Sequence, residues 1–179
     1  MSRLGELTQK VDAFFARVAG RHGTDMQCHT GCSDCCHVRL TITWVEAAAI
    51  RAYVAGLPGH ARAALASSGP ADRCAALDAA GRCKIYDARP LVCRSHGVPI
   101  RLRQASLPVV QACHHNFRST TPDPDCILDQ TTLSATLLAI DAQARAPGDP
   151  RDPRAGTAGP AGAGSRVELA TLLADLATI

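Results

Sequence analysis

Four cysteines stand within nine residues of this chain, and this density of thiols constrains the fold more than any other sequence feature. They are Cys28, Cys32, Cys35 and Cys36. The first three have the short separations that let a turning backbone direct several sulfurs at one centre. Adjacent side chains diverge in a strand or a helix, so Cys35 and Cys36 are expected to face different metal ions or different atoms of a cluster. The motif therefore predicts an assembly larger than one four-ligand site.

The rest of the chain supplies four more thiols that can complete such an assembly, which leaves one of the nine cysteines over. Eight thiols are enough for two four-sulfur sites, or for one cluster with spare ligands. Cys126 is expected to be a buried thiol that binds no metal. The predicted metal ligands are Cys28, Cys32, Cys35, Cys36, Cys74, Cys83, Cys93 and Cys113.

Histidines near these cysteines give a weaker signal. Each could replace a thiol or donate a hydrogen bond to a sulfur, although such residues are more often polar surface groups. Whether Cys113 or any histidine is a ligand stays open at this point. The histidines are His29, His37, His96, His114 and His115.

The cysteine pattern also carries a family resemblance. Cys-x₃-Cys-x₂-Cys-Cys, followed by Cys74 and by the stretch from Gly81 to Arg94 with its Ile-Tyr-x-x-Arg-Pro, resembles the YkgJ-type cysteine-cluster family, described as zinc- or iron-chelating. The later Cys113-His114-His115-Asn116-Phe117 resembles a Cys-x-x-Asn-Phe element in part of that family. The resemblance covers residues 27–117. It implies a metal-binding cysteine domain, and it brings no reaction or substrate.

The first twenty residues contain four charged groups among their apolar positions, so they do not form the hydrophobic region of a signal peptide. No apolar run approaches membrane-spanning length. We therefore expect a cytoplasmic protein with no membrane contact, in a compartment where a cysteine pattern indicates metal binding or catalysis more readily than disulfides.

Charge gives no argument for a nucleic-acid partner. The formal net charge is +3, and coordination by eight thiolates would turn it slightly negative. Seven basic residues between positions 73 and 103 lack interleaved stacking aromatics, so we interpret them as neutralising a thiolate-rich site rather than binding RNA. They are Arg73, Arg82, Lys84, Arg89, Arg94, Arg101 and Arg103.

Hydrophobic periodicity and turn residues predict the elements. An amphipathic helix is expected over 2–19, a short strand over 38–42, and a helix to residue 55 that opens with a Thr43–Glu46 capping box. A helix over 60–67, a hairpin over 74–86 and a helical turn capped by Asp87 should follow. A second hairpin over 98–110, turning at residues 104–106, and a helix over 127–143 complete the core of the prediction.

The predicted fold class is α+β, a small metal-centred domain with helices around one or two short β-hairpins. Residues 1–145 form the metal-binding domain, whose motif core is 27–117. Residues 146–164 are rich in Pro, Gly and Ala and are expected to be a flexible linker. Residues 165–179 should form a short helix that begins with a Ser165–Glu168 capping box and gathers four leucines on one face.

Taken together, the sequence predicts a metal-binding protein that chelates zinc or an iron-sulfur centre, in an accessory or structural role. The alternative is an iron-sulfur redox or modification enzyme, which the surplus of cysteines slightly favours. Zinc and iron both accept thiolate sulfur in tetrahedral geometry, so the spacing leaves the metal open, and with it whether the protein is an enzyme. The expected partner is a metal ion, and an unidentified protein could bind the C-terminal tail.

Overall fold

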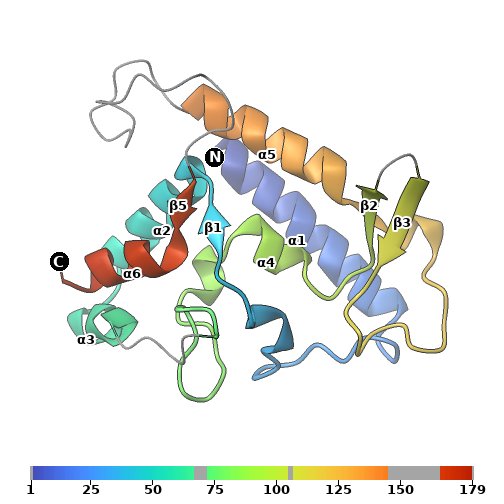
Figure 1. Ribbon diagram of the computed structural model, residues 1–179, viewed down its shortest axis with the longest axis horizontal. Helices are drawn as coiled ribbons and strands as arrows, with labels where there is room; N and C mark the ends of the chain where they lie inside the picture. The colour runs from blue at the N-terminus through green and yellow to red at the C-terminus, as the bar shows by residue number, and fades with distance from the viewer. Residues whose placement is uncertain (1, 67–71, 105–106, 145–165, 179) are drawn as a thin grey trace. The chain divides into compact units, whose positions relative to one another are not determined.

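The computed structural model describes residues 2–66, 72–104, 107–144 and 166–178 (Figure 1). The chain forms two compact units, of which the first comprises Met1–Cys35 with Arg89–Leu137 and the second Cys36–Ala88 with Leu138–Ile179. Each unit combines helices with one small sheet, which confirms the α+β class. None of the helices within the described ranges is long and apolar enough to cross a membrane.

The first unit begins with the long helix α1, Arg3–Arg21, which confirms the amphipathic prediction. Ser2 caps it, since its hydroxyl accepts a hydrogen bond from the Gly5 amide at 3.1 Å. Residues seven positions apart fall on one face of a helix, and the buried residues of α1 have this spacing. They are Leu4, Val11 and Val18.

Helix α4, Leu91–Ser95, packs against α1 in the same unit. The buried guanidinium of Arg94 donates through Nη1 to the Asp12 carboxylate on α1 at 2.7 Å and through Nε to the Arg89 carbonyl at 2.9 Å. Asp87, predicted to cap this helix, lies instead in the 3-10 turn Tyr86–Ala88, and α4 begins directly after Pro90. Proline suits this place because its missing N–H would have no partner in the first helical turn.

A three-stranded sheet completes the first unit. Strands β2, Ile100–Gln104, and β3, Leu107–Gln111, pair antiparallel, which confirms the second predicted hairpin; residues 105–106 of its turn lie outside the described residues. Strand β4, Leu128–Asp129, adds to β2 in parallel and follows the 3-10 turn Pro124–Cys126. The apolar centre beside this sheet consists of the buried residues Val18, Met26, Val98 and Cys126.

Helix α2, Trp44–Ala55, is the longest helix that lies wholly in the second unit, and it opens on the predicted capping box. The Glu46 carboxylate accepts from the Thr43 amide at 3.0 Å and from the Thr43 hydroxyl at 2.8 Å, and both residues are buried. Asp141, near the end of helix α5, Gln130–Ala144, accepts from the Val45 amide at 2.8 Å. Side chains therefore satisfy several of the free amides at the start of this helix.

The C-terminal segment is part of the core of the second unit. Strand β5, Val167–Glu168, pairs antiparallel with β1, Thr41–Ile42, beside which it lies in Figure 1. Helix α6, Leu169–Ala177, then buries its predicted apolar face against α2 and the turn Ala64–Ala66 that follows α3, Gly59–Ala63. The four leucines of that face are Leu169, Leu172, Leu173 and Leu176.

Besides the Asp87 cap, two local predictions were wrong. The hairpin expected over 74–86 is reduced to a single bridge between Leu77 and Cys83 around a tight turn with Gly81 at φ 73°. The predicted start of the last helix also fails, because Glu168 belongs to β5 and α6 begins one residue later. The predicted linker at 146–164 and Ser165 lie outside the described residues.

Replacing Thr43 with alanine is expected to lower the free energy of unfolding by about 1–2 kcal/mol, because the first turn of α2 loses its cap and the buried Glu46 loses a hydroxyl donor. Chemical denaturation monitored by circular dichroism measures this loss. Thr43→Ser keeps the hydroxyl and should retain most of the stability. Equal losses in the two variants would show that the cap contributes nothing.

Candidate metal centre

The loop after α1 carries the first three predicted ligands, all in the first unit. It reverses direction at a turn in which the Cys32 amide donates to the His29 carbonyl at 3.1 Å, and Gly31 takes a φ of 93° within it. A left-handed φ of this kind is open to glycine at little cost. The short 3-10 turn Asp34–Cys36 follows and contains Cys35. The Cys28 thiol interacts electrostatically with those of Cys32 and Cys35 across this loop.

Cys28 lies within electrostatic reach of three other thiols. Its surroundings raise the pKa of its thiol above the ordinary value: burial of the sulfur is the largest cause, a hydrogen bond from Asn116 opposes the rise, and negative charge on neighbouring thiolates adds to it. A cation among these sulfurs reverses the balance, since a metal binds the thiolate and releases its proton. The neighbouring thiols are those of Cys113, Cys32 and Cys35.

The buried side chain of Asn116 supports Cys28. Its Nδ2 donates to the Cys28 sulfur at 3.3 Å and to the Gly97 carbonyl at 2.7 Å, and its Oδ1 accepts from the Gln27 amide at 2.8 Å. Phe117, the next residue, has a φ of 52°, and its amide donates to the Asp25 carbonyl at 3.0 Å. Asn116 thereby ties the Cys113 segment to the cysteine loop, in the manner of groups that orient metal ligands.

Gly97 leaves room for the Cys28 sulfur. Its φ is 98°, and a Cβ built on it would lie 2.6 Å from that sulfur and 3.5 Å from the Asn116 amide nitrogen. A separation of 2.6 Å is far inside van der Waals contact, so a side chain here would displace the sulfur. Glycine is therefore required at this position by both conformation and space.

The second unit holds three further predicted ligands. The Cys74 amide donates to the Cys36 carbonyl at 2.8 Å, and Cys83 forms the bridge with Leu77 three residues beyond Cys74. Cys74 is buried in the apolar core, and Cys36 and Cys83 pack against it. Burial lowers the pKa of Lys84, while negative charge on Asp78, Cys74 and Cys83 opposes that change. Cys35 is the last residue of the first segment of the first unit, and Cys36 is the first residue of the second unit.

The two remaining cysteines lie elsewhere in the first unit. Cys93, a predicted ligand, is half-buried on α4, where its amide donates to the Pro90 carbonyl at 3.0 Å. Cys126, predicted to be a buried thiol that binds no metal, is fully buried in the apolar cluster beside the sheet.

Most of the histidines lie at the surface. His29, His37 and His96 are exposed, and His29 Nδ1 lies 3.0 Å from the Thr30 carbonyl oxygen. His115 Nε2 lies 2.6 Å from the Asp34 carboxylate, with His114 Nε2 at 3.7 Å from the same oxygen. Asp34 stands between Cys32 and Cys35, and the sequence pattern did not single it out.

Two groups of described residues bring three potential ligand atoms within 4.8 Å of one another, and neither consists of the predicted cysteines. One is Asp34 with His114 and His115, and the other is His22 with Asp123 and Cys126. Arg82 and Arg94, two of the basic residues assigned from the sequence to neutralise thiolates, pair with the Asp78 and Asp12 carboxylates at 3.0 and 2.7 Å.

The thiols near Cys28 have the chemistry that zinc and iron prefer, because cysteine sulfurs from a short-spaced loop and a distant segment are typical of sites for these metals. A family model with the description "CxxCxxCC: Putative zinc- or iron-chelating domain" matches residues 27–121, more than half of the chain. The chain belongs to this family of zinc- or iron-chelating cysteine domains. No curated protein and no solved structure matches it.

Proposed function

We propose that this protein holds zinc or iron in a structural or accessory centre, with Cys28, Cys32, Cys35 and Cys113 as the ligands of one ion. The observation that carries the proposal is the position of Cys28, whose sulfur is within electrostatic reach of the other three thiols. Asn116 and Gly97 hold that sulfur in one place. Without a cation this arrangement disfavours ionisation of the Cys28 thiol, because a thiolate there would be buried beside other thiolates, and a bound metal reverses this by stabilising the thiolates.

A structural role is favoured over a catalytic one by the number of sulfurs. Four thiolates fill the tetrahedral coordination of Zn²⁺ and leave no position for a substrate, whereas catalytic zinc sites keep one position open. The bound ion would join the loop after α1 to the segment that contains Cys113 and Asn116. Chelation would therefore stabilise the first unit, as it does in other domains whose metal sites form only in the folded state.

The other predicted ligands stay part of the proposal. In the second unit, the Cys74 backbone is hydrogen-bonded to that of Cys36, and the nearby Leu77 is bridged to Cys83. In the first unit, Cys93 lies on α4. Three thiols at the edge of an apolar core would suit a second metal ion better than three thiols on a solvent-exposed surface would. If substitution of one of these four cysteines lowers the metal content, that cysteine is a ligand of a metal centre.

Anaerobic purification, elemental analysis and a visible spectrum test the function. A colourless protein with stoichiometric zinc is the expected result for a structural centre. A brown protein with iron and acid-labile sulfide would instead support the iron-sulfur redox or modification enzyme. Absence of both metals from the purified chain, with no binding on reconstitution, would contradict the proposal.

Replacement of a ligand tests the assignment. Cys32→Ser and Cys113→Ser are each expected to lose one equivalent of metal and the stabilisation that it provides, which is about 4 kcal/mol when free metal exceeds the dissociation constant a thousandfold. Ser33→Ala, in the same loop, is the matched control and should retain both. Unchanged metal content and melting temperature in both cysteine variants would exclude these residues as ligands.

A further inference from the structure

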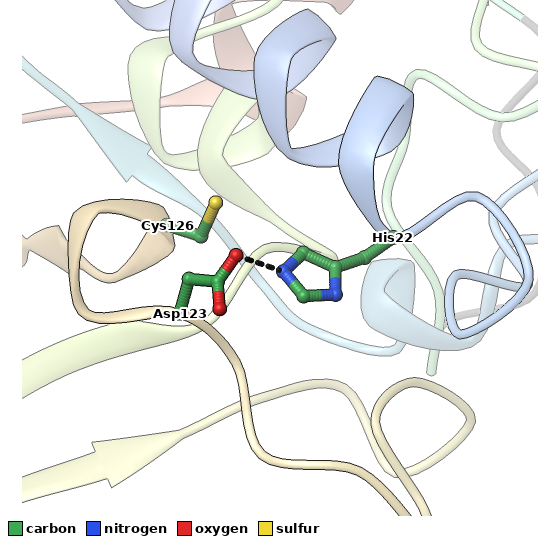
Figure 2. A group of neighbouring side chains, drawn as sticks. All are labelled: His22, Asp123 and Cys126. Atoms are coloured by element: carbon green, nitrogen blue, oxygen red, sulfur yellow. Dashed lines mark ion pairs between the residues drawn. The ribbon is translucent and has the colours of Figure 1, made fainter.

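A second group of potential ligands lies in the first unit, where the end of α1 meets the turn before β4. His22 caps the C-terminus of α1, Asp123 precedes the turn Pro124–Cys126, and Cys126 is the last residue of that turn. One nitrogen, one oxygen and one sulfur of these residues lie within 4.8 Å of one another. Figure 2 shows the imidazole and the carboxylate facing each other, with Cys126 beside Asp123. About a hundred residues separate the two sides of the group.

The Nε2 atom of His22 is buried and has no hydrogen-bond partner among the described residues. It nevertheless lies 3.4 Å from the Asp123 Oδ2. Zn–N and Zn–O bonds of about 2.0–2.2 Å arranged tetrahedrally place two ligand atoms roughly 3.3–3.5 Å apart. The separation of nitrogen and oxygen therefore matches the edge of a metal tetrahedron, and a bound cation would satisfy a buried nitrogen that is otherwise unpaired.

The surroundings of His22 resemble the support that metal-binding histidines usually have. Its second ring nitrogen, Nδ1, lies 3.5 Å from the Asp25 carboxylate, and a carboxylate on the far ring nitrogen orients a histidine ligand. The Phe117 ring packs edge-on against the imidazole, with centroids 5.1 Å apart. The imidazole plane is thus held from two sides, while 54% of the Asp123 side chain faces solvent.

The negative charges of the proposed ligands equal the positive charge of a divalent cation. The Asp123 carboxylate and the Cys126 thiolate together match the charge of one Zn²⁺ ion, with a histidine as the neutral ligand. Arg21 is a nearby positive charge to account for, since its Nη1 lies 4.0 Å from Asp123 and the guanidinium also interacts with the Cys126 sulfur. That guanidinium is paired with the Asp125 carboxylate at 2.6 Å, and this pair is the main reason that the pKa of Arg21 is raised. Asp125 therefore offsets the charge that would otherwise repel a metal.

We propose that His22, Asp123 and Cys126 bind one divalent transition-metal ion, which in the cell is Zn²⁺. The fourth coordination position would be open to water on the exposed side of Asp123. The mixed nitrogen, oxygen and sulfur donors suit zinc or cobalt, and are too soft for magnesium or calcium. This site is separate from the thiolate centre around Cys28 and does not depend on its function.

Metal titration of the full chain tests the site, with Co²⁺ as the spectroscopic probe and Zn²⁺ for stoichiometry. Asp123→Asn and Cys126→Ala are each expected to bind one equivalent less than the unmodified chain, and Cys126→Ala should also lose part of the sulfur-to-cobalt charge-transfer absorption. Glu6→Gln is the control for loss of one surface carboxylate, because Glu6 is exposed in the first turn of α1, at the opposite end of that helix from His22, and it should keep the full stoichiometry. Circular dichroism checks that the variants are folded, and Asp123→Asn carries the test if the buried Cys126 variant is not.

Unchanged stoichiometry and affinity in Asp123→Asn would overturn the site. An equal loss in Glu6→Gln would also overturn it, because it would show that only surface charge matters. A Cys32→Ser, Cys113→Ser double variant separates this proposal from the function proposed above. It should still bind one equivalent at His22, even if the thiolate centre proves not to bind metal at all. Failure of that variant to bind any metal while the unmodified chain does would assign all binding to the thiolates.

Discussion

Replacing Gly97 with alanine is expected to lower the free energy of unfolding of the first unit by about 1–3 kcal/mol, because alanine at a φ of 98° is strained. The new Cβ would also lie 2.6 Å from the Cys28 sulfur, so that sulfur must move. A displaced ligand binds metal less well, and we expect a loss of metal affinity beyond the loss of stability. Denaturant unfolding of the metal-free chain and competition with a chelator for Zn²⁺ measure the two effects separately.

Gly20 provides the matched control. It lies within α1, and a Cβ on it would have nothing within 4 Å. Alanine is a better helix former than glycine, so Gly20→Ala should leave metal affinity unchanged and raise stability by about 0.5–1 kcal/mol. Wild-type metal affinity in Gly97→Ala would mean that the Cys28 sulfur is not a ligand or that the backbone at Gly97 is free to shift.

The second large effect is expected at Asn116. Asn116→Ala leaves the Gln27 amide and the Gly97 carbonyl without their partner and removes the donor to the Cys28 sulfur. A buried polar group without a partner costs about 1–3 kcal/mol, and loss of a group that orients a metal ligand typically lowers affinity about 10–100-fold. Zinc competition titrations and unfolding experiments measure both quantities.

Asn116→Asp sharpens the test because it keeps the acceptor for the Gln27 amide but offers a carboxylate to the sulfur. Negative charge beside the sulfur should raise the pKa of the Cys28 thiol further and weaken metal binding at neutral pH. Gln27→Ala, which removes a side chain bonded only to the Thr24 carbonyl at 3.2 Å among the described contacts, should bind metal normally. An Asn116→Asp variant that binds as tightly as wild type would show that the amide donor has no part in holding the ligand.

Local sequence patterns predicted helices correctly where residues close in the sequence determine the start of the helix. Two capping-box patterns in this chain make the limit clear. Thr43–Glu46 caps α2 as predicted, because each partner is three residues from the other and the helix follows at once. Ser165–Glu168 has the same pattern, yet Val167 and Glu168 pair with β1. The strand that decides the second case is about 125 residues away, and a local pattern carries no sign of it.

The candidate site shows the same difference between features that depend on local sequence and features that depend on distant residues. The spacing of Cys28, Cys32 and Cys35 predicted that one loop gathers these thiols, since a short chelate loop needs little from the rest of the fold. Asn116 was visible only as part of the Cys-x-x-Asn-Phe resemblance, and its bond to Cys28 joins residues 88 positions apart. Gly97 carried no signal, because its role depends on which sulfur the fold places beside it.

The group of His22, Asp123 and Cys126 could not be predicted for a related reason. Each residue is alone in its own stretch of sequence, without the i, i+3 or i, i+4 spacing that marks ligands on one element. Burial at Val18, Met26 and Cys126 brings the end of α1 to the turn before β4. The juxtaposition is a consequence of packing, which sequence spacing does not encode.

The pairing of β5 with β1 has a practical consequence for anyone who wishes to express a minimal version of this protein. A gene fragment trimmed to the family match at 27–121 would lack α1 and α6. It would leave Ile50, Ile42 and their neighbours without the leucines that cover them, and would leave Val98 without Val18, Met26 and Cys126. Each uncovered core side chain forfeits about 1.5–3 kcal/mol, so the trimmed fragment should be insoluble or unfolded. The boundary of the motif is not the boundary of the folding unit.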